Sequence, residues 1–74
     1  MTNDENLKNI IRNNLINCRI EHDLTQTDVG KIVGKSKTAV ASWEQGLSMP
    51  DVATLYKLAQ YYGKTIAFMY GEKE

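Results

Sequence analysis

The stretch from Lys37 to Gln45 carries side chains that could hydrogen-bond to a partner along one side of a helix. Val40, Trp43 and Glu44 recur on one side at helical spacing. The opposite side holds only small or polar residues, namely Lys37, Thr38, Ala41, Ser42 and Gln45. Small side chains let a helix backbone approach a surface, and ammonium and hydroxyl groups supply hydrogen bonds. This side is suited to enter a polar groove, although a solvated helix face has the same residue types.

The major groove of DNA, about 12 Å wide, admits a helix of this kind. Lysine suits O6 and N7 of guanine, the hydroxyls of threonine and serine can serve several bases, and an alanine methyl suits the thymine methyl. On the outward side of residues 37–45 these groups belong to Lys37, Thr38, Ala41 and Ser42. Arginine, asparagine and glutamine are missing from these four positions.

Two N-cap residues and a glycine predict how this helix is positioned. Thr25 can cap a preceding helix, and Asp28, three residues later, places a negative charge near the positive helix end. Gly34 suits the left-handed residue that ends that helix, and Ser36 can cap the next one. Residues 26–45 therefore predict two helices joined by a sharp turn, a helix-turn-helix.

Gly30 lies in the middle of the first of these two helices, where glycine costs about 1 kcal/mol relative to alanine. Val29, Ile32 and Val33 recur around it at helical spacing and predict one apolar side. We expect that another helix crosses at Gly30 too closely to admit a side chain.

Three further helices complete an all-α, five-helix prediction. We expect a first helix from about Glu5 to His22. Its apolar core stripe comprises Leu7, Ile11, Leu15 and Cys18. Three isoleucines, Ile10, Ile16 and Ile20, are expected to widen this stripe. A helix from Val52 to Tyr62 is capped by Asp51 and has one apolar face, comprising Val52, Leu55, Leu58, Ala59 and Tyr62. Thr65 caps a last short helix, Ile66 to Tyr70. We expect a flexible N-terminus (1–4), one domain (5–71) and a tail (72–74).

Composition restricts the function classes. The 74 residues have a formal net charge of zero, yet residues 31–64 hold five lysines against two carboxylates, so a local basic face is expected. No apolar run approaches the roughly 18 residues of a membrane span, and no signal peptide is evident, so we expect a cytoplasmic protein. The single Cys18 excludes an intramolecular disulfide and fits a reducing compartment.

Metal binding and catalysis find little support in the sequence. Cys18 and His22 lie one helical turn apart, but two ligands do not make a metal site, so we expect Cys18 in the core and His22 on the surface. With one histidine, no Ser/His/Asp set and no glycine-rich phosphate loop, we expect neither an enzyme nor a cofactor. No small-molecule ligand is evident.

The order of these residues resembles the Cro/CI-type helix-turn-helix family, the xenobiotic-response-element family of phage repressors and bacterial regulators. From Leu24 the chain reads LTQTDVGKIVGKSKTAVASWEQGLSMP. The resembling pieces are Leu24-Thr25-Gln26, Gly30, Gly34, Ser36, Val40, Trp43-Glu44-x-Gly46 and Pro50. The likeness covers roughly Ile11 to Tyr70. It implies a compact lambda-repressor-like DNA-binding domain whose partner is double-stranded DNA.

The resemblance also implies that Lys37, Thr38, Ala41 and Ser42 contact base edges. Because long bidentate side chains are missing from these positions, we expect modest discrimination at each half-site. Other residues would have roles outside this base-reading face. Gln26 would donate to a phosphate together with backbone N–H groups at its helix N-terminus. Further phosphate contacts would come from Lys31, Lys35, Ser36 and the backbone around Gly46. In the family an arginine of the first helix pairs with the glutamate of the Trp-Glu-x-Gly piece, which implies a structural ion pair between Arg19 and Glu44.

The last helix departs from the family pattern, which usually has acidic or polar residues where this chain has Ala67 and Phe68. Two interpretations stay open for Phe68 and Tyr70: a homodimer face, or packing of Phe68 onto Ile16 and Ile20. The leading functional hypothesis is a transcriptional regulator, most simply a repressor that binds a palindromic operator as a dimer. The alternative is a protein-interaction module of the antitoxin or anti-repressor type, which keeps the helix-turn-helix as a scaffold.

Overall fold

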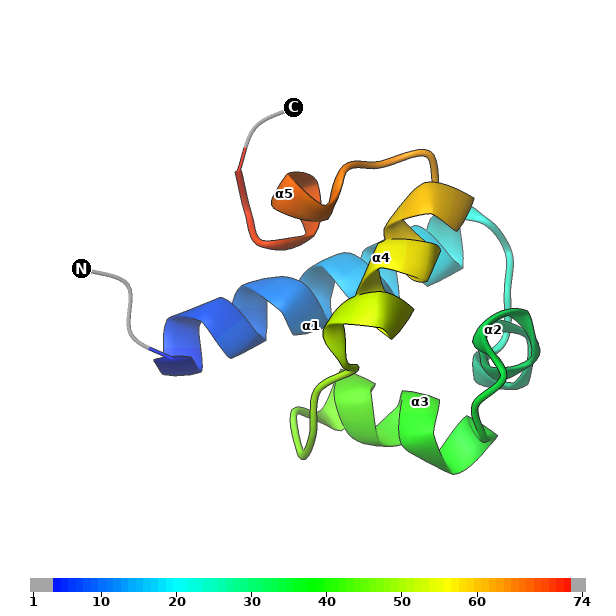
Figure 1. Ribbon diagram of the computed structural model, residues 1–74. Coiled ribbons are helices and arrows are strands. Elements are labelled where there is room, and N and C mark those ends of the chain that lie inside the picture. The colour runs from blue at the N-terminus through cyan, green and yellow to red at the C-terminus, as the bar shows by residue number, and fades with distance from the viewer. Residues whose placement is uncertain (1–3, 73–74) are drawn as a thin grey trace.

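The computed structural model describes residues 4–72, which form five helices and no strand in that range (Figure 1). The helices are α1 (Asp4–Glu21), α2 (Gln26–Val33), α3 (Lys37–Gln45), α4 (Val52–Tyr61) and α5 (Ile66–Met69). The all-α, five-helix prediction is confirmed. Most of the predicted flexible N-terminus (1–4) and tail (72–74) lies outside the described residues.

Each of the last four helices begins at a side-chain cap. The cap oxygen accepts a hydrogen bond from the backbone N–H three residues later, at distances of 2.7 to 3.1 Å. These caps are Thr25, Ser36, Asp51 and Thr65, as the sequence predicts. Four predicted helix ends differ from the observed ones by one residue. α1 runs from Asp4 to Glu21 rather than from Glu5 to His22, α4 ends at Tyr61 rather than Tyr62, and α5 ends at Met69 rather than Tyr70.

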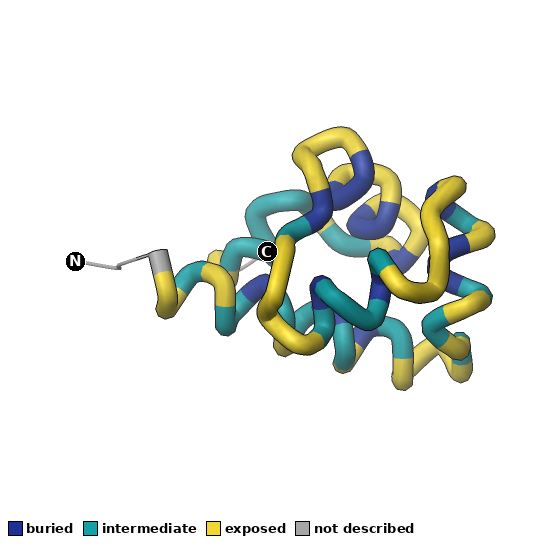
Figure 2. Tube along the Cα trace, turned by 90° about the horizontal axis from the view of Figure 1, so that it is seen from below, coloured by how far each residue is buried: buried dark blue, intermediate teal, exposed yellow. Residues whose placement is uncertain are grey.

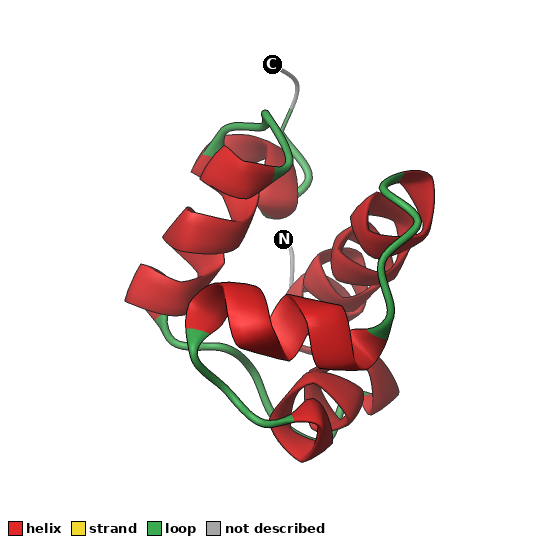
Figure 3. Ribbon diagram, turned by 90° about the vertical axis from the view of Figure 1, so that its right-hand side faces the viewer, coloured by secondary structure: helices red, strands yellow, loops and turns green. Residues whose placement is uncertain are grey.

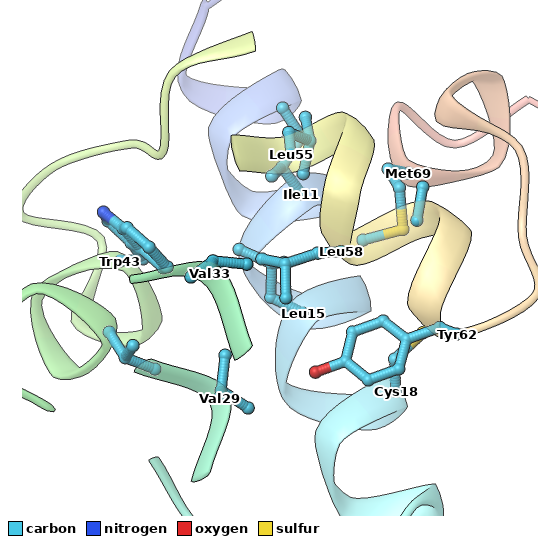
Figure 4. Close-up of a cluster of buried hydrophobic side chains, with 12 residues drawn as sticks. Ile11, Leu15, Cys18, Val29, Val33, Trp43, Leu55, Leu58, Tyr62 and Met69 are labelled. Atoms are coloured by element: carbon cyan, nitrogen blue, oxygen red, sulfur yellow. The ribbon is translucent and has the colours of Figure 1, made fainter. Parts of the chain in front are cut away.

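The other four helices lie around α1, which runs across the molecule (Figure 1). α3 and α5 lie on opposite sides of α1, and α2 lies at the end of the molecule away from the N-terminus (Figure 1). Seen from that end, α2 lies in front, with α3 below it and α4 to its upper left (Figure 3). The core between them receives side chains from each helix (Figure 4). Its buried hydrophobic residues are Ile11, Leu15, Cys18, Val29, Val33, Val40, Trp43, Leu55, Leu58, Ala59, Tyr62 and Met69.

Two predicted core residues lie on the surface instead. Ile20 is 58% exposed and Val52 is 69% exposed. Ile20 follows Ile11 by nine residues, which at about 100° per residue places it on the opposite side of α1. Val52 is the first residue of α4 and lies at the edge of the face that buries Leu55 and Leu58. The apolar stripe is therefore narrower on both helices than the sequence suggests.

Gly30 is required by a close approach, but the neighbour is not a crossing helix. A Cβ atom at this position would lie 2.5 Å from the carbonyl oxygen of Lys35, far inside van der Waals contact. Lys35 belongs to the turn that connects α2 to α3. The prediction of a helix crossing at Gly30 is wrong, because the turn itself folds back over α2.

Candidate nucleic-acid interface

The turn between α2 and α3 is fixed by backbone hydrogen bonds to one carbonyl. Gly34 adopts the left-handed conformation (φ 70°, ψ 35°), and its N–H donates to the carbonyl oxygen of Gly30. The N–H of Lys35 donates to the same oxygen at 2.8 Å. Ser36 then begins α3 by accepting from the N–H of Ala39 at 3.1 Å. Its hydroxyl proton is not used by this cap, so it remains available to an outside acceptor.

The two sides of α3 differ as the sequence predicts. Val40 and Trp43 are 1% and 6% exposed and face the core. On the other side Lys37 and Thr38 are exposed, whereas Ala41 and Ser42 are half-buried. The trace viewed from the side on which α3 lies shows exposed and half-buried segments alternating with the buried ones (Figure 2). The predicted base-reading residues therefore share a face that the protein leaves accessible.

Glu44 joins three helices through its carboxylate. Nε of Arg19 in α1 donates to Oε2 at 2.7 Å, and Nη2 donates to Oε1 at 3.0 Å. The amide of Gln26, the first residue of α2, donates to Oε1 at 3.1 Å. The hydrogen bonds from Arg19 raise the pKa of its guanidinium above the ordinary value. The ion pair implied by the resemblance is present, and it fixes α3 against α1.

The bond from Gln26 to Glu44 is not evident from the sequence. The cap at Thr25 places Gln26 at the start of α2, and the resemblance implies a phosphate contact for its amide, but no periodic pattern connects it to a residue 18 positions later. One amide hydrogen of Gln26 is used by Glu44, and the second remains to reach a phosphate. Gln26 therefore lies at the start of α2, and its hydrogen bond to Glu44 orients its side chain.

Ser42 has a partner that the sequence reading also missed. Its Oγ lies 2.7 Å from Oγ of Ser48, in the loop between α3 and α4. This contact connects the recognition side of α3 to the loop that follows Gly46. A hydroxyl pair can exchange donor and acceptor roles, so Ser42 keeps the ability to serve either kind of base atom.

The lysines of the helix-turn-helix gather around its turn. Lys31, Lys35 and Lys37 are all exposed. Hydrogen bonds at Thr54 lower the pKa of Asp51, and the positive charges of Lys35 and Lys57 lower it further. Lys35 thus lies close enough to the start of α4 for its charge to lower the pKa of Asp51.

α5 is held against the core rather than standing out from it. Phe68 and Tyr70 are half-buried and pack on the core, and the ammonium of Lys64 lies 4.7 Å from the centre of the Phe68 ring. The amide of Asn14 in α1 donates to the carbonyls of Phe68 and Met69, both at 3.1 Å. The large hydrophobic side chains with most exposure lie elsewhere, at Ile20, Leu47, Val52, Tyr56 and Tyr61.

The predicted positions of Cys18 and His22 are confirmed. Cys18 is buried at 2% exposure, and the exposed His22 has Nδ1 at 2.9 Å from the carbonyl oxygen of Cys18. The His22 ring also packs against Tyr62, with 4.9 Å between ring centres. Within residues 4–72 no three histidine, cysteine or carboxylate side chains gather as metal ligands would. None of the helices described there is long and apolar enough to cross a membrane.

Comparison with known proteins places this geometry in a family. The helix-turn-helix family model HTH_3 matches residues 15–69, which include all the residues from Arg19 to Gly46 considered above. The chain belongs to the HTH_3 helix-turn-helix family. The resemblance to Cro/CI-type domains is confirmed by this match.

Two relatives of this HTH_3 chain have regulatory names. One is the cryptic phage CTXphi transcriptional repressor RstR of Vibrio cholerae, 36% identical over 56 residues, which cover 76% of this chain and 50% of the relative. The other is the uncharacterized HTH-type transcriptional regulator MJ0272 of Methanocaldococcus jannaschii, 32% identical over 66 residues, covering 86% of this chain and 100% of the relative. The chain thus spans about half the length of the Vibrio cholerae repressor.

A solved structure supports the HTH_3 fold. The crystal structure of an HTH_3 family transcriptional regulator from Vibrio cholerae superposes with a TM-score of 0.74 at 29% sequence identity. The match covers 88% of this chain and 36% of that protein. The fold of this chain is therefore shared with that regulator over most of its length.

Proposed function

We propose that this protein is a sequence-specific, double-stranded DNA-binding transcriptional regulator that inserts α3 into the major groove. The observation that carries the proposal is the asymmetry of α3. Its inward side is fixed by Val40, Trp43 and the carboxylate of Glu44, while its outward side presents donors and small side chains that are exposed or half-buried. A helix held in this way can enter a groove without rearrangement.

In this proposal the contacts divide into two classes. Lys37, Thr38, Ala41 and Ser42 read base edges. Phosphates of the backbone are bound by side chains and N–H groups that surround the helix-turn-helix, namely Gln26, Lys31, Lys35, Ser36 and the backbone at Gly46. Base contacts carry sequence information, whereas phosphate contacts set affinity and orientation.

We further propose that the protein represses transcription by occupying a palindromic operator as a homodimer. The name of the Vibrio cholerae relative, a transcriptional repressor, supports repression. Two-fold symmetry is the commonest arrangement of oligomers, and two half-sites about 34–36 Å apart would compensate for the modest discrimination of one reader. Phe68 and Tyr70 remain our candidates for part of the dimer face. A regulator of this kind acts in the bacterial cytoplasm, where the DNA is.

The proposal is tested by selecting bound sequences from a random pool of duplex DNA. We expect an inverted repeat whose half-sites lie one helical turn apart. Titration of the recovered duplex at about 50 and 200 mM salt should show binding that weakens steeply with salt. A protein-interaction module of the antitoxin type would recover no motif and would show no salt-dependent binding, and that outcome would reject the proposal.

A further inference from the structure

We propose that Arg12, which the sequence reading assigned no role, is an additional contact to a DNA backbone phosphate. This inference rests on the proposed function and concerns the C-terminal end of α3. Arg12 lies in α1, and Gly46, the residue that ends α3, comes 34 positions later in the sequence. The fold brings the side chain of Arg12 close to Gly46.

 

The side chain of Arg12 occupies the space that a side chain at position 46 would face. A Cβ atom built on Gly46 would lie 3.6 Å from Cδ of Arg12 and 3.8 Å from its Nε. Gly46 adopts a left-handed conformation (φ 79°, ψ 15°) at the end of α3, and it is exposed together with Leu47 and Ser48. The fold therefore brings a cation of α1 beside the loop that follows the recognition helix.

The guanidinium of Arg12 has more donors than the described part of the chain uses. Its Nη2 donates to Oδ1 of Asn9 at 3.2 Å. Its Nε is buried and has no hydrogen-bond partner among the described residues. The salt bridge found within residues 4–72 belongs to Arg19 and Glu44, so no carboxylate there neutralises Arg12. Because Nε is shielded from solvent, an anion from outside would bind the terminal nitrogens of this half-buried side chain.

The position of Arg12 complements the lysines at the other end of α3. The nine residues of α3 extend about 13 Å, close to the roughly 12 Å width of the major groove. Lys35 and Lys37 stand at the N-terminal end, and the sequence has no lysine or arginine from residue 38 to residue 56. Arg12 supplies the positive charge that the C-terminal end lacks. With α3 in the major groove, each of the two DNA backbones that border the groove would then have a cation beside it.

A competing role for Arg12 is purely structural. Its positive charge lies near the negative end of the α3 dipole and could stabilise the helix there without any DNA. That role predicts a loss of thermal stability on neutralisation and no change in the salt dependence of DNA binding. The phosphate contact predicts a change in salt dependence, because each neutralised phosphate releases counterions.

The test measures binding of the full chain to a fluorescein-labelled duplex recovered by the selection, across about 50 to 200 mM salt. We expect Arg12→Gln to reduce the slope of log K against log salt by about 0.9, and Arg12→Lys to keep most of the slope. Lys64→Gln is the matched control, because Lys64 lies over Phe68 on the side of α1 away from α3, and its slope should equal that of the wild type.

The outcomes separate this inference from the proposed function. A wild-type slope in a folded Arg12→Gln variant, with wild-type binding intact, overturns the Arg12 contact and leaves the proposed function standing. Failure of the wild type to bind any duplex overturns both. The last measurement compares the thermal stability of both proteins in inorganic phosphate at matched ionic strength. If phosphate stabilises the wild type more than Arg12→Gln while the two proteins have the same salt slope for DNA binding, Arg12 binds the free ion. That outcome rejects the contact with the DNA backbone.

Discussion

Arg19 and Glu44 meet through two hydrogen bonds, from Nε to Oε2 at 2.7 Å and from Nη2 to Oε1 at 3.0 Å. Their side chains are 19% and 8% exposed, so the pair is largely withdrawn from water. Glu44 also holds Gln26, the first residue of α2. One carboxylate thereby fixes the positions of α1, α2 and α3 relative to one another.

Removing one partner of this pair should be costly. We expect Arg19→Ala or Glu44→Ala to lower the free energy of unfolding by about 3–5 kcal/mol, because each leaves an uncompensated charge in a largely buried place. The double variant Arg19→Met with Glu44→Met should lose less than the sum of the two single methionine variants. Urea denaturation followed by circular dichroism measures all of these. Additive losses would mean that the two side chains act independently.

The close approach at Gly30 predicts that alanine there lowers stability, contrary to the usual effect of alanine in a helix. Alanine normally stabilises a helix relative to glycine by about 1 kcal/mol. At Gly30 the new Cβ would lie 2.5 Å from the carbonyl oxygen of Lys35, so the turn would have to move. We expect Gly30→Ala to destabilise the fold by about 1–3 kcal/mol, the usual range for overpacking. Thr27→Ala, at an exposed position of the same helix, is the control and should be neutral or slightly stabilising.

Tyr62 predicts a loss of stability at alkaline pH. Burial raises the pKa of its phenol from 10.0 to about 12. Because the folded pKa lies above the unfolded one, the resulting stabilisation is complete below pH 10 and is lost as pH rises toward 12. The loss should reach about 1 kcal/mol near pH 11. Tyr62→Phe should remove it, so the difference between variant and wild type in urea denaturation should change with pH in this range and stay constant below it.

The sequence predicts the fold well because its signals are local. The caps at Thr25, Ser36, Asp51 and Thr65 act within three residues, and the two sides of α3 follow from helical spacing. The width of a buried stripe depends instead on which neighbour covers it, and that is why Ile20 is 58% exposed.

The contacts within the candidate site could not be predicted in the same way, because they join different segments of the chain. The hydrogen bonds of Gln26 with Glu44 and of Ser42 with Ser48, and the closeness of Arg12 to Gly46, each connect different segments of the chain. No periodic pattern contains such pairs, since they arise only when the helices pack. Residue types predicted which side chains could contact a partner, and packing determined how those side chains are oriented.

Lys37 and Lys31 should respond differently to removal, although both are exposed lysines of the helix-turn-helix. Lys37 is the first residue of α3, where the N-terminal part of a recognition helix reaches base edges. Lys31 lies in the last turn of α2, from which a side chain reaches the backbone. We expect Lys37→Ala to relax the preference at one base position by about 1–3 kcal/mol. Lys31→Ala should instead weaken binding to all sequences alike and reduce the salt slope by about 0.9.

Selection with each variant from the same duplex pool, followed by titration at two salt concentrations, measures both effects. An unchanged recovered motif for Lys37→Ala would remove Lys37 from the base-reading set, because a side chain that reads a base cannot be deleted without changing the preference at that base.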